Sequence, residues 1–212
     1  MPATELIDEL IRDGKIIRYY DLRKRTFRDL TGHGAALTPR TATAKTLYPH
    51  ARGVSAPKKS GASFLVPNSA DWNAANDGTI IFFGRWEWNN TGYMFIKGYP
   101  IFSFAWIAGA NILEMRTNAG TTRRTIVGPR RCLGINYYSS GVVAPSLYEN
   151  GELVGLFSNV RNVTLTNSDA AWLGINNAST GSGSENIAEA LIITNQRLTD
   201  IEHRQIYREL MA

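Results

Sequence analysis

The segment AEALIITNQRLTDIEHRQIYREL, residues 188–210, passes from strand-forming residues into a helix without a linker. Residues 190–194 are apolar or β-branched, a composition that favours a pleated strand. Thr199 and Glu202 then have the spacing of a capping box, which marks the start of a helix with an apolar stripe further along. The spacing therefore predicts a strand that leads directly into a C-terminal helix over residues 199–210.

Short strand-like runs separated by turn residues fill the chain upstream of this segment, from residue 63 onward. In SLYENGELVG, Asn150 and Gly151 are the preferred pair of a two-residue type I′ hairpin between antiparallel strands. Strands without crossover helices between them must be antiparallel, and at this length two facing sheets are the usual arrangement. The sequence therefore predicts an all-β, antiparallel two-sheet sandwich.

The start of the chain carries a different pattern. TELIDELIRDG, residues 4–14, has apolar residues at helical spacing, with Thr4 as the expected N-cap and Gly14 as the stop. Residues 15–22, KIIRYYDL, read as a strand, and residues 39–62, rich in Pro, Thr, Ala, Ser and Lys, show no clear period. We interpret 39–62 as an extended connector that lies over the domain.

Positive charge is concentrated in the first 60 residues. They hold 12 Lys and Arg against 6 Asp and Glu, whereas residues 61–212 hold 11 against 12. Basic segments favour anionic partners, although a solvated surface is the alternative. We predict that residues 1–60 are a docking segment packed on the domain and that residues 61–212 form the sandwich. The predicted docking residues are Leu6, Leu10, Ile11, Arg18, Arg23, Lys24, Arg25 and Arg28.

Composition restricts the class of protein further. A chain of 212 residues with 43% apolar content can bury the core of one domain. Cys132 is the single cysteine, so an internal disulfide is excluded, and its apolar surroundings indicate a small buried side chain. The first residues include acids and lack an apolar core, and no segment approaches the roughly 18 apolar residues of a membrane span. We expect a soluble protein made in the cytoplasm without a Sec signal.

Several of these motifs together carry a family resemblance. LYENGELV (147–154), WLGI (172–175) and LTDIEHRQIY (198–207) resemble, in this order, the "LYxNGxLV" strand, the "LxIG" strand and the "xLSxxEIxxLY" helix of laminin G-like domains. These domains belong to the concanavalin A-like lectin/glucanase superfamily, and the likeness covers nearly the whole chain after residue 15. It implies a jelly-roll sandwich whose C-terminal helix caps one end.

The resemblance also allows a test for enzyme chemistry. Glucanases of this superfamily carry a Glu-x-Asp-x-x-Glu row, because retaining hydrolysis needs two carboxyl groups about 5 Å apart. No Glu of this chain is followed by Asp two positions later, and the strand acids stand isolated. The three His residues have neither metal-ligand spacing nor a nucleophile partner. We therefore predict no enzymatic activity and no catalytic residue.

Two kinds of ligand site remain open. Asp71, Asn73 and Asp77 offer oxygen ligands for calcium, but the spacing is not that of an EF-hand, and ordinary turn chemistry explains the same residues. We therefore predict no metal and no cofactor, with calcium as the alternative. Carbohydrate binding requires exposed aromatic side chains beside polar groups. The candidates for glycan contact are Tyr93, Tyr99, Tyr137 and Tyr138.

Two functional hypotheses follow. The first is a non-enzymatic structural protein of a bacteriophage virion, a capsid decoration or other head or tail surface protein that contacts capsid or tail subunits. It explains a lectin-like sandwich without a signal peptide, since virions assemble in the host cytoplasm, and it allows a homo-oligomer within the particle. The alternative is a lectin-like module that recognises cell-surface glycans. We do not expect direct nucleic-acid binding, because no known nucleic-acid motif accompanies the positive charge.

Overall fold

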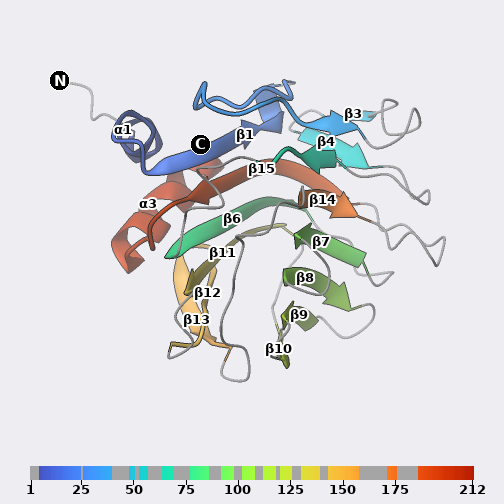
Figure 1. Ribbon diagram of the computed structural model, residues 1–212, viewed down its shortest axis with the longest axis vertical. Helices are drawn as coiled ribbons and strands as arrows, with labels where there is room; N and C mark the ends of the chain where they lie inside the picture. Colours follow the sequence, from blue (N-terminus) through green and yellow to red (C-terminus); the bar gives the residue numbers. More distant parts are fainter. Residues whose placement is uncertain are drawn as a thin grey trace.

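The computed structural model is an antiparallel two-sheet sandwich with a helix near each end of the chain, as the sequence predicts (Figure 1). The residues that it describes are 5–24, 26–39, 48–50, 53–56, 64–68, 77–85, 92–97, 102–107, 112–117, 120–125, 130–138, 143–157, 171–175 and 186–212.

The first sheet has eight strands in the order β13-β12-β11-β6-β15-β4-β3, with β1 also paired to β15. Every pairing in it is antiparallel. Its strands are β1 (Ile16–Asp21), β3 (Tyr48–His50), β4 (Gly53–Ala56), β6 (Asp77–Arg85), β11 (Arg130–Tyr138), β12 (Ser146–Glu149), β13 (Glu152–Leu156) and β15 (Asn186–Thr194).

The second sheet has seven strands in the order β10-β9-β8-β7-β14-β5-β2 and faces the first. Its strands are β2 (Thr38–Pro39), β5 (Phe64–Val66), β7 (Gly92–Lys97), β8 (Phe102–Ile107), β9 (Ile112–Thr117), β10 (Gly120–Thr125) and β14 (Ala171–Ile175). The helices are α1 (Leu6–Arg12), the 3-10 turn η1 (Leu22–Lys24) and α3 (Asp200–Met211). No helix of the described residues has the length and apolar character needed to cross a membrane.

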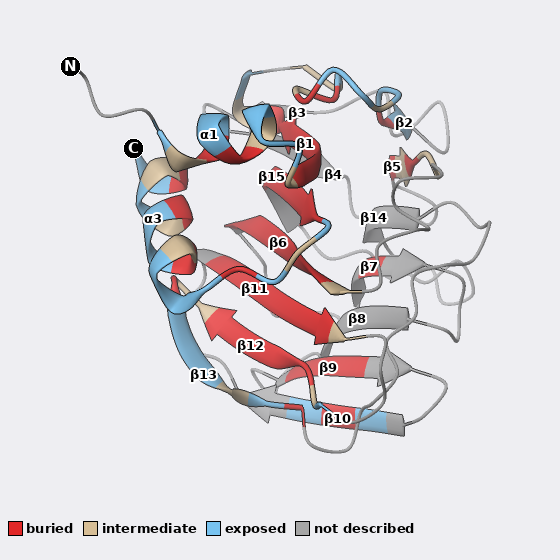
Figure 2. Cartoon of the chain, turned by 60° about the vertical axis from the view of Figure 1, so that its left-hand side comes forward, coloured by how far each residue is buried: buried red, intermediate tan, exposed pale blue. Residues whose placement is uncertain are grey.

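Two apolar clusters bury the first sheet on both faces. Ile80 and Phe82 of β6 point between the sheets, whereas Ile81 and Phe83 pack on the outer face beneath the two helices. Figure 2 accordingly shows the described residues of β6 as buried along most of the strand, while β13 at the sheet edge is exposed. This double burial explains why residues 190–194 of β15 are continuously apolar instead of alternating.

Local sequence signals at the C-terminal half are confirmed. Asn150 and Gly151 adopt φ values of 54° and 83° between β12 and β13, as a type I′ turn requires. At the start of α3, the Glu202 amide donates to Thr199 Oγ1 at 3.3 Å and the Thr199 amide donates to Glu202 Oε2 at 2.7 Å. The capping box therefore fixes the first turn of α3.

The N-terminal helix begins differently from the prediction. Its N-cap is Glu5 instead of Thr4, and no side chain of the segment caps it. The amides of Leu6 and Ile7 donate to the Glu209 carboxylate of α3, at 2.6 Å and 3.0 Å. A residue at the opposite end of the chain thus satisfies the first orphan donors of α1 and places an acid at its positive end.

The first 60 residues contribute strands to the sandwich. β1 pairs with β15 along its length, and β3 and β4 extend the first sheet within the segment that we interpreted as a connector. Residues 39–62 therefore contribute strands as well as a connection. Strands of the first 60 residues thus form part of both sheets, and the assignment of this segment to docking stays a prediction.

The predicted docking stripe is also covered. Leu10 is buried and, with the partly buried Leu6 and Ile11, packs in the cluster beneath α3. Arg18 is buried too, with its Nε 3.8 Å from Oδ2 of Asp29. The sequence pattern identified an apolar stripe correctly, but its partner is this chain's own C-terminal helix. Of the other predicted docking residues, Arg23 is half-buried, Lys24 and Arg28 are exposed, and Arg25 lies outside the described residues.

Candidate functional site

A cleft with a volume of about 530 Å³ opens on the outer face of the first sheet, beside the N-terminus of α3. β6 begins there, β11 ends there, and the turn from β15 to α3 crosses in front of them. We call it the α3 cleft. Its lining residues are Asp77, Asn136, Tyr138, Tyr148, Gln196, Arg197, Leu198 and Thr199.

One wall of the α3 cleft is charged but internally balanced. Arg197 Nε lies 3.6 Å from Oδ2 of Asp77, and both side chains are about half exposed. The same guanidinium lies over the ring of Tyr138, 4.5 Å from the centroid, which is a cation–π arrangement. Interaction with the Tyr138 phenol raises the pKa of Arg197 above its ordinary value, so this side chain carries a constant positive charge.

The opposite wall is formed by Tyr148. Its hydroxyl donates to Oδ1 of Asp200 at 2.8 Å, and its ring stacks on the imidazole of His203. Burial, followed by the hydrogen bond to Asp200, raises the pKa of the Tyr148 phenol. The hydroxyl therefore stays protonated, with its lone pairs as hydrogen-bond acceptors.

A buried polar network forms the floor of the α3 cleft. Asn136 Oδ1 accepts from Thr79 Oγ1 at 2.6 Å and lies 3.0 Å from His203 Nε2. Asn136 Nδ2 donates to the Leu198 carbonyl at 2.8 Å, and the Leu198 amide donates to Thr79 Oγ1 at 3.0 Å. Burial lowers the pKa of His203 to about 4, so a neutral imidazole with its proton on Nε2 fits the network. These bonds hold Leu198, in the 195–199 turn, to β6 and β11 through both its amide and its carbonyl.

The turn itself is tied to the start of the chain. The Asn195 amide donates to the Lys15 carbonyl and its side-chain Nδ2 donates to the Gly14 carbonyl, both at 3.0 Å. Because Thr199 caps α3 at the other end of the turn, the intervening Gln196 and Arg197 are held between two fixed points. The sequence NQRLT therefore presents two polar side chains from a rigid frame.

Only part of the predicted glycan contact is found at this site. Tyr138 lines the cleft, whereas Tyr137 points between the sheets with an exposed fraction of 0%. The assignment of Tyr137 as a surface contact is wrong, because neighbouring residues of a strand face opposite sides of the sheet. The side chains of Tyr93 and Tyr99 lie outside the described residues, so their assignment stays a prediction.

The remaining predicted site residues are separated from one another. Asp77 lies in the α3 cleft beside Arg197, and Asp71 and Asn73 lie outside the described residues. Within the described part of the chain, no three His, Cys, Asp or Glu residues are grouped in a way that could hold a metal ion. Cys132 is buried as predicted, and burial raises the pKa of its thiol to about 12.

Sequence reasoning missed most of the α3 cleft. Arg197, Gln196 and Tyr148 had no motif that marked them as functional. The available signal was the polar run NQR, residues 195–197, between an apolar strand and a capped helix. A polar run of this kind is expected at the surface and not in the core. It indicates a surface turn, but it does not indicate that Asp77 and Tyr138 lie beside it.

No family model and no curated protein matches this chain. Among solved structures, one match is a botulinum neurotoxin type C protein whose cell entry depends on interaction with two ganglioside molecules; the identity is 16%, the TM-score is 0.73, and the match covers 96% of this chain and 53% of that chain. Another is the binding domain of botulinum neurotoxin DC in complex with rat synaptotagmin II, with 16% identity, a TM-score of 0.72, and coverage of 94% and 52%.

A third match is domain 4 of AbnA, a GH43 extracellular arabinanase from Geobacillus stearothermophilus, in complex with arabinotriose. Its TM-score is 0.68 at 16% identity, with 91% of this chain and 98% of that chain covered. This chain spans about half the length of the two toxin chains. At these identities the likeness shows the fold alone, a two-sheet β-sandwich.

Proposed function

We propose that this protein is a non-catalytic carbohydrate-binding module and that the α3 cleft is its binding site. The observation that carries the proposal is the composition of the cleft, in which Tyr138 and Tyr148 stand beside Asp77, Gln196 and Arg197. Ligand sites of this kind are concave, partly apolar, and contain a few fixed polar groups that orient the ligand.

The chemistry of a sugar matches such a lining. A sugar ring has an apolar face of C–H groups, which can contact the partly exposed ring of Tyr138, and a rim of hydroxyl groups that both donate and accept. Carboxylate, amide and guanidinium groups supply the complementary acceptors and donors. The volume of about 530 Å³ lies within the range of about 300 to 1,000 Å³ that is usual for small-ligand sites.

The structural neighbours support this proposal over a virion role. One toxin protein depends on ganglioside molecules for cell entry, and the arabinanase domain is in complex with arabinotriose. The toxin domain in complex with synaptotagmin II binds a protein, so a protein partner is the second kind of ligand that the neighbours suggest. The virion role, with its capsid or tail partners and its location on a phage particle, stays a prediction from the sequence. The apolar stripe on which its docking segment depended is covered by α3.

A hydrolase is the less favoured reading of the same cleft. Glycoside hydrolysis generally uses a pair of carboxyl groups across the scissile bond, about 5 to 9.5 Å apart. Among the described residues that line the α3 cleft, Asp77 is the one carboxylate, and Arg197 lies beside it. The buried strand acid Glu114 is held by Arg123 at 2.9 Å on the other sheet. Binding without cleavage is therefore the activity that this lining favours.

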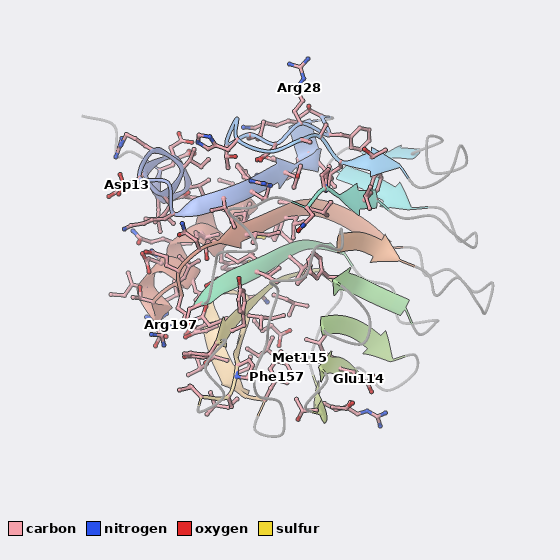
Figure 3. The ribbon with its side chains drawn as sticks, viewed as in Figure 1. Asp13, Arg28, Glu114, Met115, Phe157 and Arg197 are labelled. Atoms are coloured by element: carbon pink, nitrogen blue, oxygen red, sulfur yellow. The ribbon has the colours of Figure 1, made fainter. Side chains whose placement is uncertain are left out.

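A glycan array probed with the labelled protein, followed by calorimetry on the best neutral or acidic oligosaccharide, tests the proposal. We expect at least one glycan to bind, and we expect Arg197→Ala to lower the affinity for it at least tenfold. Arg28→Ala is the matched control, because Arg28 is exposed and projects from a part of the surface far from Arg197 (Figure 3). Absence of any hit, or equal weakening by both variants, would overturn the proposal.

A further inference from the structure

We infer that the α3 cleft selects uncharged sugars over acidic ones. This inference rests on the proposed function and names its ligand class: a neutral sugar whose adjacent hydroxyl groups bridge Asp77 and Arg197. The alternative class, sugars that carry a carboxylate, requires a cation that is not already committed within the site. The arrangement of charge around the cleft decides between the two.

The positive charge that lines the cleft already has a negatively charged neighbour. Arg197 is the one cation among the described lining residues, and it lies 3.6 Å from Asp77. Arg204, on the next turn of α3, pairs through two nitrogens with Glu152, at 2.9 Å and 3.2 Å. An acidic sugar that approached Arg197 would therefore meet the carboxylate of Asp77 at similar range, and like charges repel.

The N-terminus of α3 does not add a free anion site. Its positive end would attract a carboxylate, but Asp200 and Glu202 already occupy the first turn. Glu202 accepts from the Thr199 amide, and Asp200 accepts from the Tyr148 hydroxyl. Among the described residues at and beside the cleft, Asp77, Asp200, Glu202 and Glu152 therefore face two cations, Arg197 and Arg204, which disfavours a further negative charge.

Hydroxyl groups fit the same arrangement. The separation of 3.6 Å between Arg197 Nε and Asp77 Oδ2 is longer than a hydrogen bond between these two atoms. A hydroxyl can donate to the carboxylate while a neighbouring hydroxyl accepts from the guanidinium, so a vicinal diol satisfies both groups without separating them. The hydroxyl of Tyr148 donates its proton to Asp200, and its oxygen keeps acceptor capacity for a third sugar hydroxyl.

The test compares matched pairs of glycans that differ only in one carboxyl group, such as a galactoside and the corresponding galacturonide, and adds a panel of neutral oligosaccharides that includes arabinotriose. We expect the wild-type protein to bind the neutral member of a pair at least tenfold more tightly. Asp77→Asn should lower affinity for the neutral member and reduce the preference, because it removes the repulsion and one acceptor. Asp8→Asn, which changes the net charge equally on the exposed face of α1, should leave the preference unchanged.

The outcomes separate the two proposals. Tighter binding of the acidic members overturns the selectivity and leaves carbohydrate binding standing. A preference that Asp77→Asn leaves intact, or that Asp8→Asn reduces as much, also overturns it, because net charge or another surface then sets the selectivity. Binding to no member of the panel overturns both the proposed function and this inference.

Discussion

The imidazole of His203 stacks on the phenol ring of Tyr148, with ring centroids 3.7 Å apart and ring planes 11° apart. His203 belongs to α3 and Tyr148 to β12, so the contact joins the helix to the sheet beside the α3 cleft. Gly134 of β11 leaves room for the imidazole, since a Cβ at that position would lie 2.6 Å from His203 Cε1. The missing side chain of one residue thus permits the packing of two others.

Replacement of Gly134 by Ala should destabilise the protein. The added methyl group would force the His203 ring out of its stack and disturb its hydrogen bond to Asn136. Overpacking of this kind costs about 1 to 3 kcal/mol. Thermal or urea unfolding of the variant measures the loss.

A double-mutant cycle identifies the cause. With His203→Ala in the background, Gly134→Ala should cost much less, because the ring that it strikes is absent. An equal cost in both backgrounds would contradict the steric explanation.

Acid should weaken the protein through His203. Burial lowers its pKa to about 4 in the folded protein, with a smaller opposing effect of Asp200, while an unfolded His has a pKa of about 6.5. Between these values the unfolded state binds more protons, so the free energy of unfolding decreases as pH falls from 6.5 to 4. The loss should be on the order of 3 kcal/mol, and stability should be independent of this group above pH 7.

Urea unfolding at several pH values between 4 and 7.5 measures this dependence. His203→Gln should remove most of the slope in this range. His33→Gln is the matched control, because His33 is exposed, and it should retain the wild-type slope. If the wild-type and His203→Gln slopes coincide, the buried neutral His203 is not the cause.

Features encoded within a few residues could be predicted from the sequence. The positive φ values of Asn150 and Gly151 follow from residue types that tolerate them, and the Thr199 cap follows from a side chain that reaches its own third neighbour. The strand that precedes α3 was equally clear. These local signals predict the turn, the helix start and the strand, and with them the class of fold, because they depend on residues that are close in the sequence.

Long-range partners could not be predicted. From the sequence, Arg18 is expected to be an exposed cation, but the segment after β1 folds back and places Asp29 beside it. Asp77 and Arg197 are 120 positions apart and meet because β6 lies beside β15 in the sheet. The composition of the α3 cleft therefore depends on strand order, which no local pattern encodes.

The contact between Glu209 and the N-terminus of α1 should contribute to stability. Glu209→Gln removes the charge that faces the Leu6 and Ile7 amides, and should cost about 0.5 to 2 kcal/mol. Hydrogen exchange should become faster at these two amides. Glu9→Gln, on the exposed face of the same helix, should have a smaller effect, and equal effects would argue against a specific cap.

Gly151 should tolerate no side chain, for two reasons. Its φ of 83° is unfavourable for other residues, and an added Cβ would lie 2.8 Å from the Cα of Arg204 in α3. Gly151→Ala should therefore cost more than Gly14→Ala, where φ is 68° and no atom lies within 4 Å of the added Cβ. Melting temperatures of the two variants test this order, and a smaller loss at Gly151 would contradict the contact with α3.

Amide chemical-shift mapping with the neutral oligosaccharide that binds best tests the central claim most directly. If the α3 cleft is the binding site, the largest shifts should appear at residues 196–199 and at Tyr138 and Tyr148, and Arg197→Ala should require at least tenfold more ligand to produce them. Smaller changes should occur on the second sheet. Largest shifts on β8, β9 and β10 with an unperturbed 195–199 turn would contradict the account, because the ligand would then bind elsewhere.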